Sequence, residues 1–336
     1  MGESIVRNEK LDWVKSGCAI LIIFIHINFP GKLGYIMDSL ARIGVPLFFI
    51  VSGYYCVVND ENCLAKIRKK IHRMCILLLS LTVIYIIFYM LFFNDWDKII
   101  EYLRNFIYPR NILYTIFFNM VYAAGHLWFI SALLYTYVIY YFAVKKGFVE
   151  VMYKLVIPLL FMQILLGECL PALSITIDTP LSRNFMFIGI PFFTIGVYIR
   201  DKGNYIIHKF KRKEVSIIFF ATFFFQPIER VLTSKSAWGS ELYVSSIISA
   251  IALFVICLYP THIGVHFGIE IQKFPEFCYF FHPMIGAVLY SKLFNENGKI
   301  VNYFIPIILC TIMIILYIVW DTSYRTIKNN RQRKRI

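Results

Sequence analysis

Lys15 and His26 are ionisable residues within one apolar segment, DWVKSGCAILIIFIHIN, which covers residues 12–28. A charged side chain at bilayer depth costs about 2.5–3.5 kcal/mol, so two such residues in one segment need a reason. Their spacing corresponds to about three helical turns plus 20°, which places both on one stripe of a helix, about 16 Å apart along its axis. Histidine can accept a proton near neutral pH, and lysine can bind an anion.

His26 and Lys15 each belong to a set of basic residues, and the predicted topology places the two sets at different depths. The outer set could accept a proton and stabilise a developing anion; it consists of His26, Arg42, His126 and Arg183. The inner set could bind an anionic ligand. It consists of Lys15, His282, and two residues of the segment KIRKKIHR, Lys70 and Arg73.

Each of these residues also has a purely structural interpretation. A histidine in an apolar helix can make a hydrogen bond between helices, and His126 could be an interfacial anchor beside LWF. Arg42 and Arg183 could extend to the membrane surface, and KIRKKIHR could be an ordinary cytoplasmic loop. Several costly residues at one depth, opposite one inner basic cluster, favour the functional interpretation.

The composition indicates an integral membrane protein. Of 336 residues, 59% are hydrophobic, and the mean hydropathy is +0.66, whereas soluble domains are about 45–50% apolar. The net charge of +14 would suggest nucleic-acid binding in a soluble protein. In a membrane protein, lysine and arginine gather in cytoplasmic loops, so we expect membrane lipids and no nucleic acid as partners. The oligomeric state is left open.

The apolar runs predict an all-α integral membrane protein, a bundle of about ten transmembrane helices. We expect one domain over residues 1–320 and a basic cytoplasmic tail over 321–336. The apolar segment 111–125 is predicted as an interfacial or re-entrant helix. The ten expected spans lie at residues 12–28, 39–58, 75–93, 127–143, 151–167, 183–199, 215–226, 243–259, 277–293 and 301–320.

The distribution of lysine and arginine orients this bundle. With both termini in the cytoplasm, the cytoplasmic segments carry 22 of these residues and the outer segments carry 8. An excess of lysine and arginine marks the cytoplasmic side. The count therefore supports an even number of spans with both termini cytoplasmic.

Five motifs in this order resemble the bacterial membrane acyltransferases called acyltransferase family 3, together with the membrane half of vancomycin-resistance serine racemases. The motifs are LDWVKSGCAILIIFIHI, ARIGVPLFFIVSGYYC, HLWFISALLYTY, SRNFMFIGIPFFTIGVYIRD and CYFFHPMIG. The resemblance extends from residue 7 to about residue 320. The family's first helix carries an arginine, ten residues and a histidine; Lys15 and His26 occupy these positions. Lys70 and Arg73 stand where the family has Arg-x-x-Arg.

This resemblance implies a membrane O-acyltransferase of the bacterial cytoplasmic membrane. The donor would be acyl-CoA, usually acetyl-CoA, and the acceptor a hydroxyl of an extracytoplasmic or lipid-linked carbohydrate. His26 would be the general base, and Arg42, His126 and Arg183 would stabilise the oxyanion or hold the acceptor. Lys15, Lys70, Arg73 and His282 would bind coenzyme A; Ser52, Trp128 and Asn184 also match the family and would contact substrate.

A transporter is the alternative, specifically one for a small amino acid such as serine. Against it, the predicted spans show no repeated Gly/Pro-broken helices and almost no central Asp or Glu. We expect no metal, because His262 and His266 have ligand-like spacing but no evident third ligand. The scattered cysteines are predicted to be small core residues.

Overall fold

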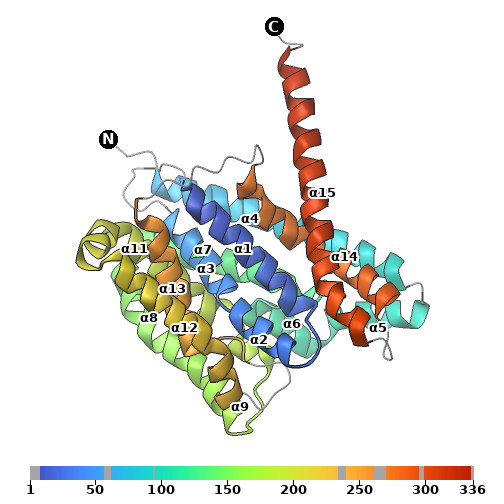
Figure 1. Ribbon diagram of the computed structural model, residues 1–336, viewed down its shortest axis with the longest axis horizontal. Helices are drawn as coiled ribbons and strands as arrows, with labels where there is room; N and C mark the ends of the chain where they lie inside the picture. The colour runs from blue at the N-terminus through green and yellow to red at the C-terminus, as the bar shows by residue number, and fades with distance from the viewer. Residues whose placement is uncertain are drawn as a thin grey trace. The chain divides into compact units, whose positions relative to one another are not determined.

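The computed structural model describes residues 8–56, 62–93, 95–233, 240–260, 270–294 and 299–333. Every regular element in these ranges is a helix (Figure 1), so the prediction of an all-α protein is confirmed. The chain forms two compact units, and each is described by itself. Residues 45–255 belong to the large unit, and residues 7–44 and 256–336 to the small unit.

The small unit is built on α1 (Glu9–His26). The side chain of Asn8 accepts a hydrogen bond from the Leu11 N–H at 3.2 Å and thereby caps the first turn. As predicted, Lys15 and His26 lie on one continuous helix. This helix contacts α2 (Gly31–Ala41), α14 (Phe274–Leu293) and α15 (Lys299–Arg333).

Two contacts set the register between α1 and α14. The Ser16 hydroxyl donates to the Ile271 carbonyl at 3.3 Å, just before α14 begins. Further along, a Cβ added at Gly286 would lie 3.1 Å from the Ile27 side chain. Positions that advance along one helix therefore advance along the other, and the two helices run in the same direction.

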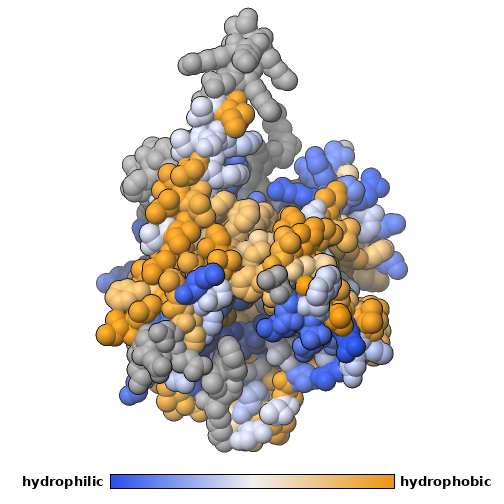
Figure 2. Space-filling view, turned by 90° about the vertical axis from the view of Figure 1, so that its right-hand side faces the viewer, coloured by the Kyte–Doolittle hydropathy of each residue, from blue (hydrophilic) through white to orange (hydrophobic). Residues whose placement is uncertain are grey.

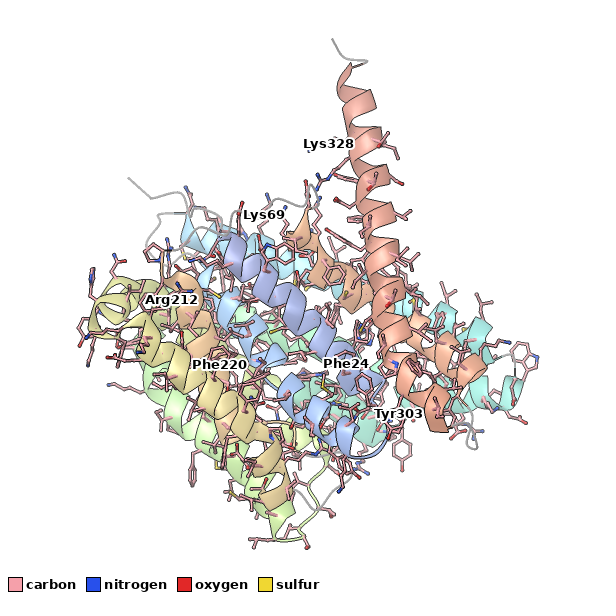
Figure 3. All side chains as sticks on the ribbon, viewed as in Figure 1. Phe24, Lys69, Arg212, Phe220, Tyr303 and Lys328 are labelled. Carbon is pink, nitrogen blue, oxygen red and sulfur yellow. The ribbon has the colours of Figure 1, made fainter. Side chains whose placement is uncertain are left out.

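The longest element is α15, with 35 residues. At about 1.5 Å per residue it is about 52 Å long, which exceeds the hydrocarbon core of about 30 Å. Tyr303 and Lys328 lie toward its opposite ends (Figure 3), and apolar side chains gather along the helix below its C-terminal end (Figure 2). The predicted border between membrane domain and basic tail, at residue 320, falls inside this helix.

In the large unit, α3 (Gly44–Tyr54) and α11 (Ile190–Lys209) approach each other backbone to backbone. A Cβ at Gly53 would lie 1.9 Å from the Phe193 carbonyl oxygen, and one at Gly196 would lie 2.0 Å from that of Ile50. Small residues permit such close crossings in membrane proteins. The other main packing pairs are α4 (Cys63–Phe93) with α7 (Trp128–Lys146), and α8 (Val149–Ile164) with α11.

Shorter elements connect these helices. They are α5 (Trp96–Ile107), α6 (Pro109–Phe118), the 3-10 turn η1 (Gly125–Leu127), the π-turn η2 (Leu165–Cys169), α9 (Leu170–Ala172), α10 (Thr179–Ser182) and the π-turn η3 (Phe185–Gly189). The segment 111–125, predicted as interfacial or re-entrant, contains most of α6, which buries none of its residues. After α6 the chain turns at Asn119, whose φ is +53°.

Seven stretches of the described chain are long and apolar enough to cross a membrane: Gly31–Tyr54, Cys63–Phe93, Gly125–Lys146, Val149–Ala172, Thr179–Lys209, Arg212–Thr233 and Ile300–Lys328. The chain is thus a multi-pass membrane protein, while the count of ten spans and the cytoplasmic termini stay predictions. The expected seventh span, 215–226, was too short, since α12 runs from Arg212 to Thr233. Pro227 does not end it, because in apolar surroundings the remaining backbone groups must stay hydrogen-bonded within the helix.

Candidate active site

His26 lies beside a second histidine, His282, in the small unit. Their ring centroids are 5.0 Å apart and the rings are tilted by 49°. His26 is exposed at the end of α1, whereas His282 is only 1% exposed. The Nδ1 atom of His282 lies 2.7 Å from the Cys278 carbonyl oxygen. Because a carbonyl only accepts, Nδ1 carries the hydrogen, and Nε2 of the neutral ring is the proton acceptor.

The sequence analysis placed His282 at the depth of Lys15, and that placement was wrong. Lys15 is about 16 Å from His26 along α1, whereas the His282 ring contacts the His26 ring. The expected span began at residue 277, but α14 begins at Phe274 after the turn at 271–273 that lies beside Ser16. This register brings residue 282 level with residue 26. The coenzyme-binding role given to His282 rested on the incorrect depth.

Both predicted cations of the small unit are paired with carboxylates. Lys15 Nζ lies 2.7 Å from Asp12 Oδ1, and Arg42 Nη2 lies 2.7 Å from Asp38 Oδ1. Arg42 is 9% exposed, which does not fit the alternative in which its side chain extends to the membrane surface. An anionic ligand at either cation would have to compete with the carboxylate.

In the large unit, the predicted outer residues lie around the start of α7. The buried His126 ring packs edge-on against Tyr85 at 4.7 Å. The Arg183 guanidinium lies 5.5 Å from the centre of the Trp128 ring and 3.5 Å from a Glu241 carboxylate oxygen. The structure thus brings Trp128 and Arg183 together as a cation–π pair.

Asn119, which sequence reasoning missed, links these positions. Its side-chain nitrogen donates to the Trp128 carbonyl at 3.2 Å, and its side-chain oxygen accepts from the Phe185 N–H at 2.7 Å. The side chain therefore ties the start of α7 to η3. Nothing in the sequence distinguished this asparagine from the preceding apolar run.

Two predicted substrate-contacting residues are engaged in local hydrogen bonds. Asn184 caps η3 by accepting from the Met186 and Phe187 N–H groups at 2.9 and 3.0 Å, and its amide nitrogen donates to backbone carbonyls of α10. The Ser52 hydroxyl donates to the Phe48 carbonyl at 2.8 Å. A substrate contact would have to share or replace these bonds, and the roles predicted for both residues stay predictions.

The predicted inner site of the large unit centres on Lys70. Its Nζ atom donates to the Tyr55 carbonyl oxygen at 2.8 Å and lies 5.5 Å from the centre of the Tyr137 ring. Arg73 follows one turn later on α4 and is exposed. Sequence reasoning missed Arg200 of α11, whose guanidinium lies 5.4 Å from the centre of the Tyr54 ring. It stands in the quoted motif FFTIGVYIRD, where it was counted as an ordinary loop charge.

A comparison with known families decides the class of the protein. The acyltransferase 3 family model, described as an acyltransferase domain, matches residues 8–228. The chain belongs to this family. No curated protein and no solved structure matches it.

The acyltransferase match contains most candidate residues of both units and ends before His282. Among the residues that the structure describes, no group of three or more His, Cys, Asp and Glu residues could hold a metal ion. His262 and His266 lie outside the described residues. Most cysteines of the acyltransferase are buried, as predicted for small core residues; the exceptions are Cys75 and Cys169.

The acyltransferase also buries carboxyl groups that sequence reasoning missed. Glu168 lies in η2 and Glu229 in α12, and both are buried. Neither residue is central, because Glu229 lies one turn before the end of α12, and the expected seventh span had ended three residues before it. The motif QPIER was the available signal, since a proline can lie within a membrane helix.

Proposed function

We propose that this acyltransferase transfers an acetyl group from cytoplasmic acetyl-CoA to a hydroxyl of an extracytoplasmic or lipid-linked cell-surface carbohydrate in the bacterial cytoplasmic membrane. The observation that carries the proposal is the His26–His282 contact at the end of α1. An accessible imidazole supported by a second one suits removal of a hydroxyl proton.

In the proposed reaction, the acceptor oxygen attacks the thioester carbonyl carbon while His26 takes the hydroxyl proton. The tetrahedral intermediate then collapses: the carbon–sulfur bond breaks, and the thiolate of coenzyme A receives the proton from His26. The oxyanion needs a cation or an N–H donor, and Arg42, His126 and Arg183 are candidates. His282, whose tautomer is fixed by Cys278, acts as a positioning residue for His26.

The donor side of the proposal rests on basic residues. The predicted ligands of the coenzyme A phosphates are Lys15, Lys70 and Arg73. Arg200 is added because its guanidinium lies over the ring of Tyr54, next in the chain to Tyr55, which binds Lys70. Arginine forms paired hydrogen bonds with phosphate oxygens, whereas lysine acts as a compact charge. A bound phosphate would compete with the Tyr55 carbonyl for Lys70.

Substitution of His26 tests the proposal. His26→Gln keeps hydrogen-bonding capacity but cannot take up the proton, so both His26→Gln and His26→Ala should lower transfer by a factor of about 10²–10⁴. We would measure radiolabelled acetyl transfer from acetyl-CoA to a bacterial cell-wall carbohydrate extract, and thermal stability. His208→Gln, an exposed histidine of α11, is the matched control. A near wild-type rate for His26→Gln would show that His26 is not the base.

Serine transport is the second candidate. The buried Glu168 and Glu229 favour it, because carboxyl groups within spans can couple transport to proton movement. Uptake of labelled serine into proteoliposomes, measured beside release of coenzyme A, separates the two functions. Uptake that survives His26→Gln, without any release of coenzyme A, would support transport.

A further inference from the structure

A polar stripe runs along α12 in the large unit. Thr222, Gln226, Glu229 and Thr233 recur at intervals of three and four residues, which is the spacing of one helix face. Away from this face the helix is apolar and exposed; Phe220, for example, is 56% exposed and lies on α12 beyond Arg212 (Figure 3). The stripe is therefore directed into the unit, where polar side chains need partners.

Glu229 is held by the beginning of α13 (Val244–Leu258). Its two carboxylate oxygens accept from the Val244 and Ser245 N–H groups, each at 3.0 Å, and from the Ser245 hydroxyl. The Glu168 carboxyl also reaches the Glu229 carboxyl within hydrogen-bonding distance. The partners at the start of α13 therefore occupy both carboxylate oxygens of Glu229.

The π-turn η2 determines where Glu168 points. In a π-turn the hydrogen bond spans five residues rather than four, so Glu168 is rotated closer to the face that carries Gln163. A Cβ added at Gly167 would lie 3.0 Å from Gln163 Nε2 and 3.8 Å from Ser182 Cβ. The Gln163 amide thus lies against Gly167, and Ser182 of α10 also lies beside Gly167.

Two amide side chains on these helices are fully buried and incompletely bonded. Gln163 and Gln226 are each 0% exposed. Within the described chain, both amide atoms of Gln163, Oε1 of Gln226 and Oε2 of Glu168 make no hydrogen bond. Gln226 Nε2 donates to the Ser249 hydroxyl at 3.3 Å. Buried amides without partners are costly, so these atoms point to a ligand that can both donate and accept.

The chemistry of the cluster selects among ligand classes. An anion would face two carboxyl groups, and a cation would have to compete with Val244 and Ser245 for the oxygens of Glu229. Hydroxyl groups each donate and accept, as do amides. A neutral ligand with several hydroxyl groups therefore fits best.

We propose that Gln163, Glu168 and Gln226 form a subsite of the large unit that binds hydroxyl groups of a neutral sugar. This subsite determines acceptor specificity, a role that rests on the proposed function, whereas binding of the sugar itself does not depend on catalysis. Ser182 of α10 lies beside Gly167, and the residue after it is Arg183, whose guanidinium lies over the Trp128 ring.

The test separates binding from catalysis in the full-length protein, reconstituted in nanodiscs. Methyl β-D-glucoside and methyl N-acetyl-β-D-glucosaminide serve as neutral probes, and glucuronate as an anionic probe. We expect the neutral sugars to raise the melting temperature of the wild type and of His26→Gln, and glucuronate to have a smaller effect. If neither neutral sugar shifts the wild type, the subsite proposal is overturned, whatever the fate of the proposed function.

Gln163→Met and Gln226→Met keep side-chain length and remove the hydrogen bonds. Each should reduce the sugar-dependent shift by at least half and raise the KM of a sugar acceptor about tenfold, while the KM of acetyl-CoA stays within twofold. Gln272→Met, outside the large unit, is the matched control and should leave all three unchanged. Wild-type sugar binding in both Gln163→Met and Gln226→Met would overturn the proposal. If one variant fails to fold, the other decides.

Discussion

The Nδ1 atom of His282 is bound to the carbonyl oxygen of Cys278, one turn earlier in α14, at 2.7 Å. This bond fixes the tautomer of a histidine whose ring contacts His26. The imidazole beside the proposed base therefore offers Nε2 as an acceptor while it is neutral. Its orientation is set within its own helix, independently of any substrate.

Replacing His282 by asparagine should separate orientation from chemistry. The amide nitrogen of asparagine can take the place of Nδ1 and keep the bond to Cys278, so we expect His282→Asn to keep its thermal stability. Its kcat should fall about tenfold, as is typical for residues that orient a reacting group, with little change in KM. The pH profile of kcat should change, since the side chain in contact with the proposed base changes from an imidazole to an amide.

His282→Ala is the companion variant, because it removes the bond as well and should lower both stability and kcat. Wild-type kcat and an unchanged pH profile in His282→Asn would contradict the positioning role.

Lys70 and Lys69 are adjacent in sequence but differ in environment, which makes a matched pair. Lys70 is half-buried and bonded to the Tyr55 carbonyl, whereas Lys69 is exposed on α4 (Figure 3). If Lys70 binds a phosphate of coenzyme A, Lys70→Gln should raise the KM of acetyl-CoA about tenfold, which corresponds to about 1.4 kcal/mol. Lys69→Gln should change it less than twofold.

The same comparison applies to Arg200→Gln, for which a rise similar to that of Lys70→Gln is expected. Steady-state kinetics at varied acetyl-CoA and fixed acceptor provide the measurement. Equal KM values for the Lys70 and Lys69 variants would contradict phosphate binding by Lys70 and favour the interpretation of KIRKKIHR as an ordinary cytoplasmic loop.

Local helical features could be predicted from the sequence, whereas relations between helices could not. The shared helix of Lys15 and His26 follows from the period of the α-helix and is present in α1. The neighbourhood of His282 depends on the register of α14 against α1, which is set by Ser16 and Gly286. No periodicity within one segment contains that information.

Proline and the π-turns explain the missed acidic residues. Pro227 was taken as the end of a span, but α12 continues through it to Thr233, so Glu229 was assigned to a loop. Glu168 is buried because η2 adds a residue to one turn, and a rigid period of 3.6 residues does not place it on the Gln163 face. Both errors arise where the helix departs from regular geometry.

The pH dependence of the loop before α10 follows from Asp178. Hydrogen bonding by Tyr114 at 2.6 Å, together with the Arg110 guanidinium, lowers the pKa of the Asp178 carboxyl below its ordinary value of about 3.8. A depressed pKa means that the bound carboxylate contributes stability above the unfolded-state pKa and loses it as pH falls through the folded value. The attachment of α6 to this loop should therefore hold above about pH 4 and weaken below it.

Hydrogen exchange of α6 between pH 3 and pH 6, corrected for intrinsic rates, measures this attachment. Asp178→Asn should remove the pH dependence and show increased exchange at every pH. Asp97→Asn, an exposed carboxylate of α5, is the control and should behave like the wild type. A pH-dependent α6 in Asp178→Asn would assign the effect to another group.

Gly196 and Gly203 provide a test of the α3–α11 crossing, because both lie on α11. A Cβ at Gly196 would lie 2.0 Å from the Ile50 carbonyl oxygen, while a Cβ at Gly203 would have nothing within 4 Å. Gly196→Ala forces the two helices apart. It should destabilise the protein by about 1–3 kcal/mol, the usual cost of overpacking. Gly203→Ala should stabilise it by about 0.5–1 kcal/mol, since alanine loses less entropy in a helix. Thermal unfolding in detergent measures both changes. Opposite signs for the two substitutions are expected, and a neutral Gly196→Ala would show that α3 and α11 do not cross at this position.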